Sequence, residues 1–159
     1  MVARGHPAAS QSDTVRRCGR TMGIPYLACM ALVASLYHLP PRVLPAIQAV
    51  EGGYPGLEHA NTNGTRDLGV MQVNTVWLVP LVRYTGTPMA TVYRRLRDDA
   101  CYSIAAAGAI MRTQLDATHD GLLRAVGNYH SHTPDLNRAY QLQVMQSAAR
   151  LFAAVQTGQ

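Results

Sequence analysis

The sequence predicts a mainly α-helical protein that folds as one domain. Alanine, leucine and other good helix formers are plentiful, whereas the strict alternation of a half-buried strand is scarce. The chain has 159 residues, 48% of them hydrophobic, which suits one sizeable core rather than two domains. The segment "PRVLPAIQAVE", residues 41 to 51, places its apolar residues at spacings of three and four, as on the buried face of a helix.

Residues 1 to 24 are predicted to be a leader or a disordered basic tail, and residues 25 to 157 to be the folded domain. The first segment is rich in arginine, serine, glycine and alanine and shows no periodicity. It holds four arginines and one aspartate, so most of the chain's net charge of +5 lies there. No internal repeat or linker divides the rest.

Residues 22 to 36, "MGIPYLACMALVASL", allow two interpretations. They form an uncharged apolar run soon after Arg16, Arg17 and Arg20, which is the layout of a secretory signal. The same run is also suited to be the first core helix of the domain. No run of 18 uncharged apolar residues occurs, so a mature transmembrane helix is not expected.

The helix predicted from about residue 41 ends in one of the chain's two glutamates, Glu51. Pro45 falls in the first turn, where a missing N–H costs little, and Gly52 and Gly53 follow the last turn, as glycine does after a helix. Apolar side chains share a face with the acid: Val43, Leu44, Ile47 and Val50. Glu51 is therefore either a solvated helix end or a buried acid that faces a substrate.

The remaining elements are read from turn residues and apolar periodicity. Residues 54 to 68 form a polar loop in which Asn63 and Gly64 indicate a tight turn and a small β-hairpin. The last helix begins with Thr133 as N-cap and Pro134 in the first position. Helices are expected at about 69–84, 88–97, 100–117, 120–130 and 134–156.

The positive charge suits an anionic partner such as nucleic acid, a membrane surface or a cell-wall polymer. All 14 basic residues are arginine, and the complete absence of lysine indicates a composition bias rather than a binding surface. No nucleic-acid-binding motif occurs. We therefore predict no nucleic-acid partner and no stable insertion into a membrane.

Three cysteines, Cys18, Cys29 and Cys101, permit one disulfide with a spare thiol, or three free thiols. No CxxC pair is present, and His130 and His132 form an HxH with no carboxylate or cysteine placed nearby. We predict neither a metal site nor a cofactor.

Three stretches stand out in order along the chain: Glu51 in "AVEGG", "DLGVMQVN" at 67 to 74, and "AVGNYHSHTP" at 125 to 134. Together they resemble the soluble-type lytic transglycosylases, a lysozyme-like family that cleaves peptidoglycan. That family has a glutamate closing a helix, then Gly-Leu-Met-Gln with a nearby Asn, then an Ala-Tyr-Asn type motif. The resemblance implies a goose-type, lysozyme-like domain with a long loop or small hairpin after the catalytic helix.

The resemblance also implies roles for individual residues. Glu51 would donate a proton to the glycosidic oxygen, and Tyr129 would hydrogen-bond its carboxyl group. The N-acetyl oxygen of the substrate would attack the anomeric carbon, and Glu51 would then act as base to give a 1,6-anhydro sugar. The predicted substrate-binding residues are Gly69, Met71, Gln72, Asn74, Tyr129 and His130.

Several of these residues also have an ordinary structural interpretation. Met71 and Tyr129 are suited to core packing, and Gln72 and Asn74 to stabilising a loop. Trp77 is the only tryptophan, and its helical context favours core packing over stacking on a sugar. Asp67 and Glu58, the nearest carboxylates to Glu51 in sequence, are predicted to cap a helix or tie down the loop, and to be solvent-exposed, respectively.

The most similar family members are the small transglycosylases that accompany type III and type IV secretion systems and pili. The resemblance implies a Cys29–Cys101 disulfide, with Cys18 left over, and hence a first helix retained in the mature protein. It further implies an exported or periplasmic monomer whose partners are peptidoglycan strands and components of a secretion or pilus machine.

Two departures from the family pattern leave alternatives open. Gly52 replaces the usual serine after the glutamate, and His130 stands where asparagine is frequent. A titrating His130 beside the cleft would tune the pH profile. A lysozyme-like hydrolase, or a wall-binding assembly protein with weak or no activity, would fit the same fold.

Overall fold

The computed structural model describes residues 23 to 153, and in this range the protein is mainly helical with one small sheet. No helix among these residues is long and apolar enough to cross a bilayer. The sequence prediction of a mainly α fold is therefore confirmed. The described helices are α1 (Leu27–Leu36), α2 (Val43–Glu51), α3 (Leu78–Thr85), α4 (Met89–Asp98), α5 (Ala100–Ala117), α6 (Gly121–His130) and α7 (Pro134–Ala153).

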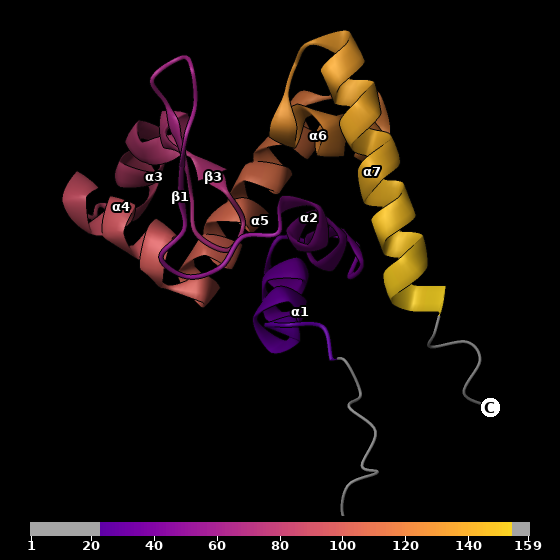
Figure 1. The fold of residues 1–159 in the computed structure, drawn as a ribbon, viewed down its shortest axis with the longest axis horizontal. Coiled ribbons are helices and arrows are strands. Elements are labelled where there is room, and N and C mark those ends of the chain that lie inside the picture. The colour runs from indigo at the N-terminus through magenta and orange to yellow at the C-terminus, as the bar shows by residue number, and fades with distance from the viewer. Residues whose placement is uncertain (1–22, 154–159) are drawn as a thin grey trace, which may run out of the picture.

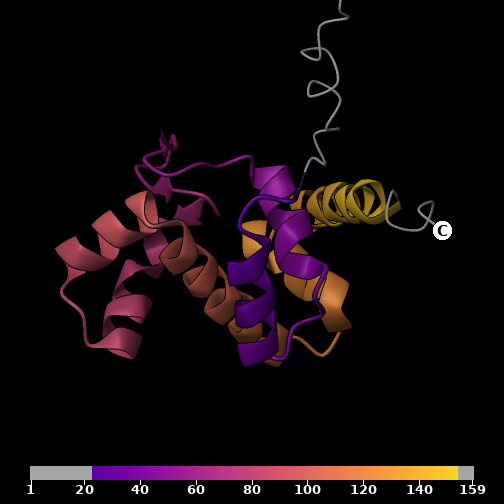
Figure 2. The same cartoon turned by 90° about the horizontal axis from the view of Figure 1, so that it is seen from below.

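Helix α5 is the centre of the arrangement. Figure 1 shows it crossing the middle of the molecule, with α3 and α4 on one side and α1, α2, α6 and α7 on the other. The view from below in Figure 2 shows the same division. Helices α1, α4 and α6 pack directly on α5, and α7 packs on α2 and α6. The acid-bearing end of α2 is thus held between α5 and α7.

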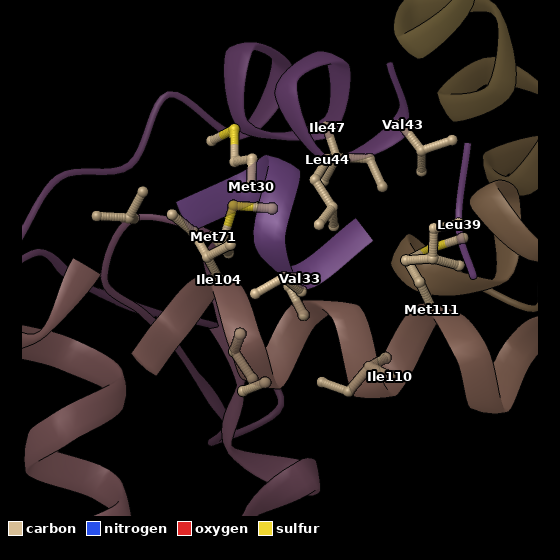
Figure 3. Packing of buried hydrophobic residues seen from close by; sticks show 14 of the residues in the cluster. Met30, Val33, Leu39, Val43, Leu44, Ile47, Met71, Ile104, Ile110 and Met111 are labelled. Atoms are coloured by element: carbon tan, nitrogen blue, oxygen red, sulfur yellow. The ribbon is translucent and has the colours of Figure 1, made fainter. Parts of the chain in front are cut away.

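The core is formed where α1, α2 and α5 meet. Met30 of α1 and Leu44 and Ile47 of α2 are fully buried, as is Ile104 of α5. Figure 3 shows Met30 and Val33 lying between the side chains of α2 and α5. Of the two interpretations of residues 22 to 36, the described structure has the core helix. The predicted leader falls almost wholly on residues 1 to 22, which lie outside the described range.

The Cys29–Cys101 disulfide implied by the resemblance is present. It joins α1 to the first turn of α5, with the two Cα atoms 5.6 Å apart and the two cysteines separated by 72 positions in sequence. Closing a loop of this length stabilises a fold by about 2 to 4 kcal/mol, because it restricts the unfolded chain. Cys18 lies outside the described residues.

The predicted hairpin is confirmed as part of a three-stranded antiparallel sheet in the order β1 (Glu58–Ala60), β2 (Arg66–Leu68), β3 (Val73–Asn74). Its turn uses the predicted residues. The Asn63 side chain accepts a hydrogen bond from the backbone N–H of Thr65 at 3.0 Å, and Gly64 has a φ of 83°. A left-handed φ of this kind favours glycine.

The helix expected over residues 69 to 84 is wrong in its first half. Residues 69 to 72 form a turn, β3 follows, and a 3₁₀ helix η2 (Thr75–Trp77) leads into α3. Gly69 and Gln72 both have left-handed φ values, 65° and 46°, which an α-helix does not admit. The Asn74 side chain then caps η2 by accepting from Val76 N–H at 3.0 Å. The other predicted helices are confirmed to within a few residues.

Candidate active site

Glu51, the last residue of α2, opens into a cavity of about 700 Å³. The hairpin and β3 form one wall of this cavity, and α5, α6 and the loop after α6 form the rest. Helix α2 ends here because Gly52 has a φ of 62° and donates its N–H to Gln48 O at 2.9 Å. The helix therefore places a carboxyl group at the edge of a hollow rather than in bulk solvent.

The chain comes unusually close to itself behind Glu51. A Cβ built on Gly53 would lie 2.2 Å from the carbonyl oxygen of Gly69 and 2.7 Å from that of Val70. Only glycine permits this approach. The two consecutive glycines therefore have different structural roles. Gly52 adopts the left-handed conformation that ends α2, and Gly53 lets the segment before β3 pack against the end of that helix.

The environment of Glu51 favours its protonated form. Burial raises the pKa of Glu51 to about 7, because the anion loses its hydration. The hydrogen bond from Tyr140 opposes the change and lowers the pKa, whereas the negative charge of Asp67 raises it. At neutral pH the carboxyl group is therefore poised between acid and base, which is the condition for general acid–base catalysis.

The hydroxyl group of Tyr140, in α7, donates to the Glu51 carboxylate, although 89 residues separate the two in sequence. Tyr140 is buried, and the ring of His130 stacks on it with centroids 4.7 Å apart and planes within 5°. Tyr140 thus bonds Glu51 through its hydroxyl group, while the imidazole of His130 covers one face of its ring. Burial, followed by the charge of Glu51, raises the pKa of Tyr140 well above its ordinary value, so it stays a donor.

The predicted hydrogen bond from Tyr129 to Glu51 is wrong. The Tyr129 hydroxyl donates instead to the backbone carbonyl of Met71 at 2.9 Å. Tyr129 still lines the cavity, and burial, followed by the charge of Glu51, raises its pKa. The bond ties α6 to the segment before β3, so Tyr129 holds together two walls of the cavity.

Gly69 and Met71, predicted to bind substrate, lie in the core instead. A Cβ on Gly69 would come within 2.1 Å of the Leu96 carbonyl, so this glycine permits contact with α4 rather than with a sugar. Met71 is fully buried, and its N–H donates to Ser103 Oγ at 3.2 Å. Of its two open interpretations, core packing is the one in the structure. The physical reason is that the segment between β2 and β3 packs on α4 at Gly69 and on α5 at Met71.

Gln72 and Asn74 do line the cavity, with part of their hydrogen-bonding capacity already used. Gln72 donates from Nε2 to Gly69 O at 2.8 Å, which fixes the side chain on the wall. Asn74 donates to Asp67 Oδ1 at 2.7 Å and to Thr65 Oγ1 at 3.0 Å. The loop-stabilising interpretation of Asn74 thus holds alongside its position in the cavity.

Asp67 faces the same cavity as Glu51, from β2. It accepts hydrogen bonds from Asn61 at 3.0 Å and from Asn74 at 2.7 Å. Of its predicted structural roles, tying down the loop is correct and capping a helix is wrong, because no helix follows it.

Glu58 is not part of this site. It lies in β1 and pairs with Arg66 of β2, and its second oxygen is 3.9 Å from Arg97 of α4. A hydrogen bond from Tyr93 and the two arginines lower its pKa. It is predicted to be solvent-exposed, but its side chain is only 22% exposed, and its pairs with Arg66 and Arg97 join β1 to β2 and to α4.

Trp77, His130 and His132 also border the cavity. Trp77 packs against the core as predicted and shows its remaining surface to the cavity. His130 borders the cavity, as predicted, and its ring stacks on that of Tyr140. Within residues 23 to 153 no cluster of three or more metal-ligating side chains includes the two histidines.

Two residues of the site escaped the sequence interpretation. Tyr140 gave no signal, since a tyrosine on the long last helix cannot be told from a core residue. Gln114 of α5 is buried and lines the cavity. Its signal was periodicity, because it stands four residues after Ile110 and seven after Ala107, on the apolar face of the helix.

No model of a known protein family matches the chain, and no curated protein matches it. The chemistry must therefore be argued from the site. A proton donor with a pKa near neutrality, a second carboxylate, and amides around a polar hollow are suited to breaking a glycosidic bond. The hollow is within the size range of ordinary small-molecule sites.

Proposed function

We propose that this protein is a peptidoglycan lytic transglycosylase with a lysozyme-like fold. The observation that carries the proposal is Glu51, a carboxyl group with a pKa of about 7 at the end of a helix, facing a cavity of about 700 Å³. The order and spacing of the motifs around Glu51, Gln72 and Tyr129 support the choice of family. The helical fold and the hairpin after the acid-bearing helix agree with it.

In the first step Glu51 donates its proton to the oxygen that links N-acetylmuramic acid to N-acetylglucosamine. The acetamido oxygen of the muramic acid attacks its own anomeric carbon as the glycosidic bond breaks. The leaving sugar departs with a free 4-hydroxyl group, and Glu51 is left as a carboxylate. Glu51 then accepts the hydrogen bond from Tyr140 as an anion, which is the form that this bond favours.

In the second step Glu51 acts as a base. The carboxylate takes the proton of the C6 hydroxyl, the C6 oxygen attacks the anomeric carbon, and the acetamido oxygen leaves it. The product is a 1,6-anhydro sugar, and no water is consumed. Glu51 gives one proton to the leaving sugar and takes another from the C6 hydroxyl, so it ends the cycle protonated again. One carboxyl group with a pKa near the working pH is therefore sufficient.

The setting of this reaction is proposed to be the periplasm or another exported location. Disulfides persist in oxidising compartments, and the Cys29–Cys101 bond joins two core helices. We further propose that the enzyme opens local gaps in the wall for a secretion or pilus machine and acts as a monomer.

The test is product analysis of purified sacculi treated with the protein. We expect soluble muropeptides that carry 1,6-anhydro ends, and we expect their release to stop in Glu51→Gln. Glu58→Gln is the matched control, because Glu58 is the other glutamate of the chain and lies outside the cavity. If the wild-type protein releases nothing, or if Glu51→Gln releases as much, the proposed activity is wrong, and a wall-binding role becomes the better explanation.

A hydrolase is the second candidate, and Asp67 is the observation that favours it. Asp67 lines the same cavity as Glu51 and stays close enough to raise the pKa of that acid. A second carboxylate at such a position can activate water or stabilise the cationic transition state. The hydrolase would leave reducing ends, heavier than anhydro ends by one water, so mass spectrometry separates the two reactions.

A further inference from the structure

The cavity of Glu51 has a side branch whose role the proposed reaction leaves open. A second hollow of about 390 Å³ shares Gln114, Asn128 and His132 with it, so the two adjoin each other at these residues. The branch runs between the end of α5 and the start of α6. Its far end is lined by His119 and Arg124.

Gln114, at the junction of the two hollows, is a buried amide with no partner. The residue is 6% exposed, and no hydrogen bond joins its side chain to another of the residues between 23 and 153. Among the described residues, Tyr102 Oη is the one solvent-inaccessible side-chain N or O atom that lacks a hydrogen-bond partner. The amide atoms of Gln114 are therefore not fully shielded from solvent. The Gln114 amide therefore faces the hollow. An amide that faces the hollow offers a ligand one acceptor and two donor N–H groups that no described residue occupies.

Asn128 supplies a second amide at the same junction. Its Oδ1 accepts a hydrogen bond from Asn137 Nδ2 at 2.9 Å, and Asn137 also donates to Ser131 O at 3.0 Å. Gly127 allows this contact, because a Cβ there would overlap Asn137. The bond holds the Asn128 carbonyl toward α7, so its amide N–H groups are the ones available to a ligand.

The far end of the branch changes from amides to charged side chains, because Arg124 and Asp120 both line it. Arg124 is 43% exposed and pairs with Asp120 at 3.8 Å, which is too long for a strong hydrogen bond, so a ligand carboxylate can compete for the guanidinium group. His119 lies beside it. A ligand that fits this branch carries amide groups near the cavity and a carboxylate further out.

A third hollow, on the other side of Trp77, suits such a ligand less well. It is lined mainly by apolar groups, including Trp77, Pro80 and Leu81. Its polar atoms are largely engaged: the Thr113 hydroxyl donates to Ala109 O at 2.9 Å, and Arg112 pairs with Asp116. Amide and carboxylate groups would lose hydration there without gaining partners.

We propose that the branch formed by Gln114, Asn128, His132, His119 and Arg124 binds the peptide stem carried by the muramic acid of the substrate. Gln114 and Asn128 bond the first amide groups of the stem, and Arg124 faces a stem carboxylate. This assignment rests on the proposed function, since it requires a peptidoglycan strand in the main cavity. It makes the enzyme selective for glycan strands that still carry their peptides.

Gln114→Met is the main test, because methionine keeps the volume of the side chain and removes the amide. With stem-bearing strands we expect KM to rise about tenfold and kcat to stay the same, the effect of one lost hydrogen bond of about 1.4 kcal/mol. With strands stripped of peptide by an amidase we expect KM to be unchanged. Gln143→Met, on the exposed face of α7, is the matched control.

Thermal stability separates ligand binding from a structural role. If Gln114 only supported the fold, Gln114→Met would lower Tm. Since its amide has no protein partner, we expect Tm to be unchanged or higher while KM rises. Arg124→Gln should raise KM for stem-bearing strands about threefold, because a partly exposed charge contributes less. Loss of Tm in Gln114→Met, or an equal rise of KM on both kinds of strand, overturns the proposal.

Calorimetric binding of a soluble stem tetrapeptide to the full-length protein tests the branch without cleavage. Binding that weakens about tenfold in Gln114→Met supports the stem site even if no glycan is cut, in which case the proposed function alone fails. Cleavage that proceeds equally well with and without stems, together with absent tetrapeptide binding, overturns the stem site and leaves the transglycosylase proposal intact.

Discussion

The two glutamates of the chain lie seven residues apart and have opposite environments. Glu51 faces a hollow and a tyrosine, and burial raises its pKa to about 7. Glu58 faces Tyr93, Arg66 and Arg97, and its pKa is lowered. Loss of hydration outweighs the hydrogen bond from Tyr140 at Glu51, whereas the hydrogen bond from Tyr93 and the two arginines outweigh it at Glu58. The lesson is that the protonation state follows from the balance between burial and partners.

The largest expected difference between the two glutamates is catalytic. Glu51→Gln should reduce the rate of muropeptide release by about a thousandfold, since removing a general acid typically costs 10²- to 10⁴-fold. Glu58→Gln should release muropeptides at nearly the wild-type rate, because its partners lie outside the cavity. Turnover of isolated sacculi measures both. Equal losses in the two variants would show that the contrast between the sites has no catalytic meaning.

The next effect is on folding stability and its dependence on pH. The folded pKa of Glu51, about 7, lies above the unfolded value of about 4.3. Stability is therefore fully present below pH 4 and falls as pH rises toward 7, by up to about 4 kcal/mol at 1.36 kcal/mol per unit. Glu51→Gln lacks this loss and should be the more stable protein at pH 8 but not at pH 4. Urea unfolding at both pH values measures it, and a gain at pH 4 would contradict it.

The two tyrosines that border the cavity sharpen the comparison at the level of about tenfold. Tyr140→Phe removes the bond that lowers the pKa of Glu51, so the acid should stay protonated to higher pH. We expect kcat to fall about tenfold and its alkaline limb to move to higher pH. Tyr129→Phe breaks the bond to Met71 O and should lower stability by about 1 kcal/mol without moving the limb. A limb that moves only in Tyr129→Phe would reverse the assignment.

The smallest effect comes from Asp67, whose charge contributes to the raised pKa of Glu51 after burial. Asp67→Asn should move the alkaline limb of kcat to lower pH, because the carboxylate of Glu51 becomes easier to form. Asp98→Asn changes an exposed aspartate paired with Arg97 and should leave the limb in place. Pure hydrolytic products that disappear in Asp67→Asn would favour the hydrolase instead.

Particular residues show where sequence reasoning succeeded. The end of α2 at Glu51 was predictable because Gly52 adopts the left-handed conformation that the pattern required. The Asn63-Gly64 turn and the start of α7 at Pro134 followed in the same way from local chemistry. The family resemblance, rather than the cysteine spacing, implies the Cys29–Cys101 disulfide, and the structure contains this bond.

Reasoning from the sequence failed where a residue's role depends on a distant neighbour. Gly69 is predicted to contact the sugar of the substrate, yet the absence of a side chain at this position makes room for the Leu96 carbonyl. The sequence does not decide whether Met71 lies in the core or lines the cavity. Only the packing of its segment against α5 places it in the core. The hydrogen bond to the Glu51 carboxyl group is predicted to come from Tyr129, but Tyr140 donates it.

By itself the sequence determined the helices, the hairpin and the position of an acid at a helix end, because caps, glycines and apolar spacing act over a few residues. Only the tertiary structure decided which tyrosine holds Glu51, which amide faces the hollow and how strongly the carboxyl is desolvated. The physical reason is that hydration is lost to whatever packs nearby, and Tyr140 reaches Glu51 across 89 residues.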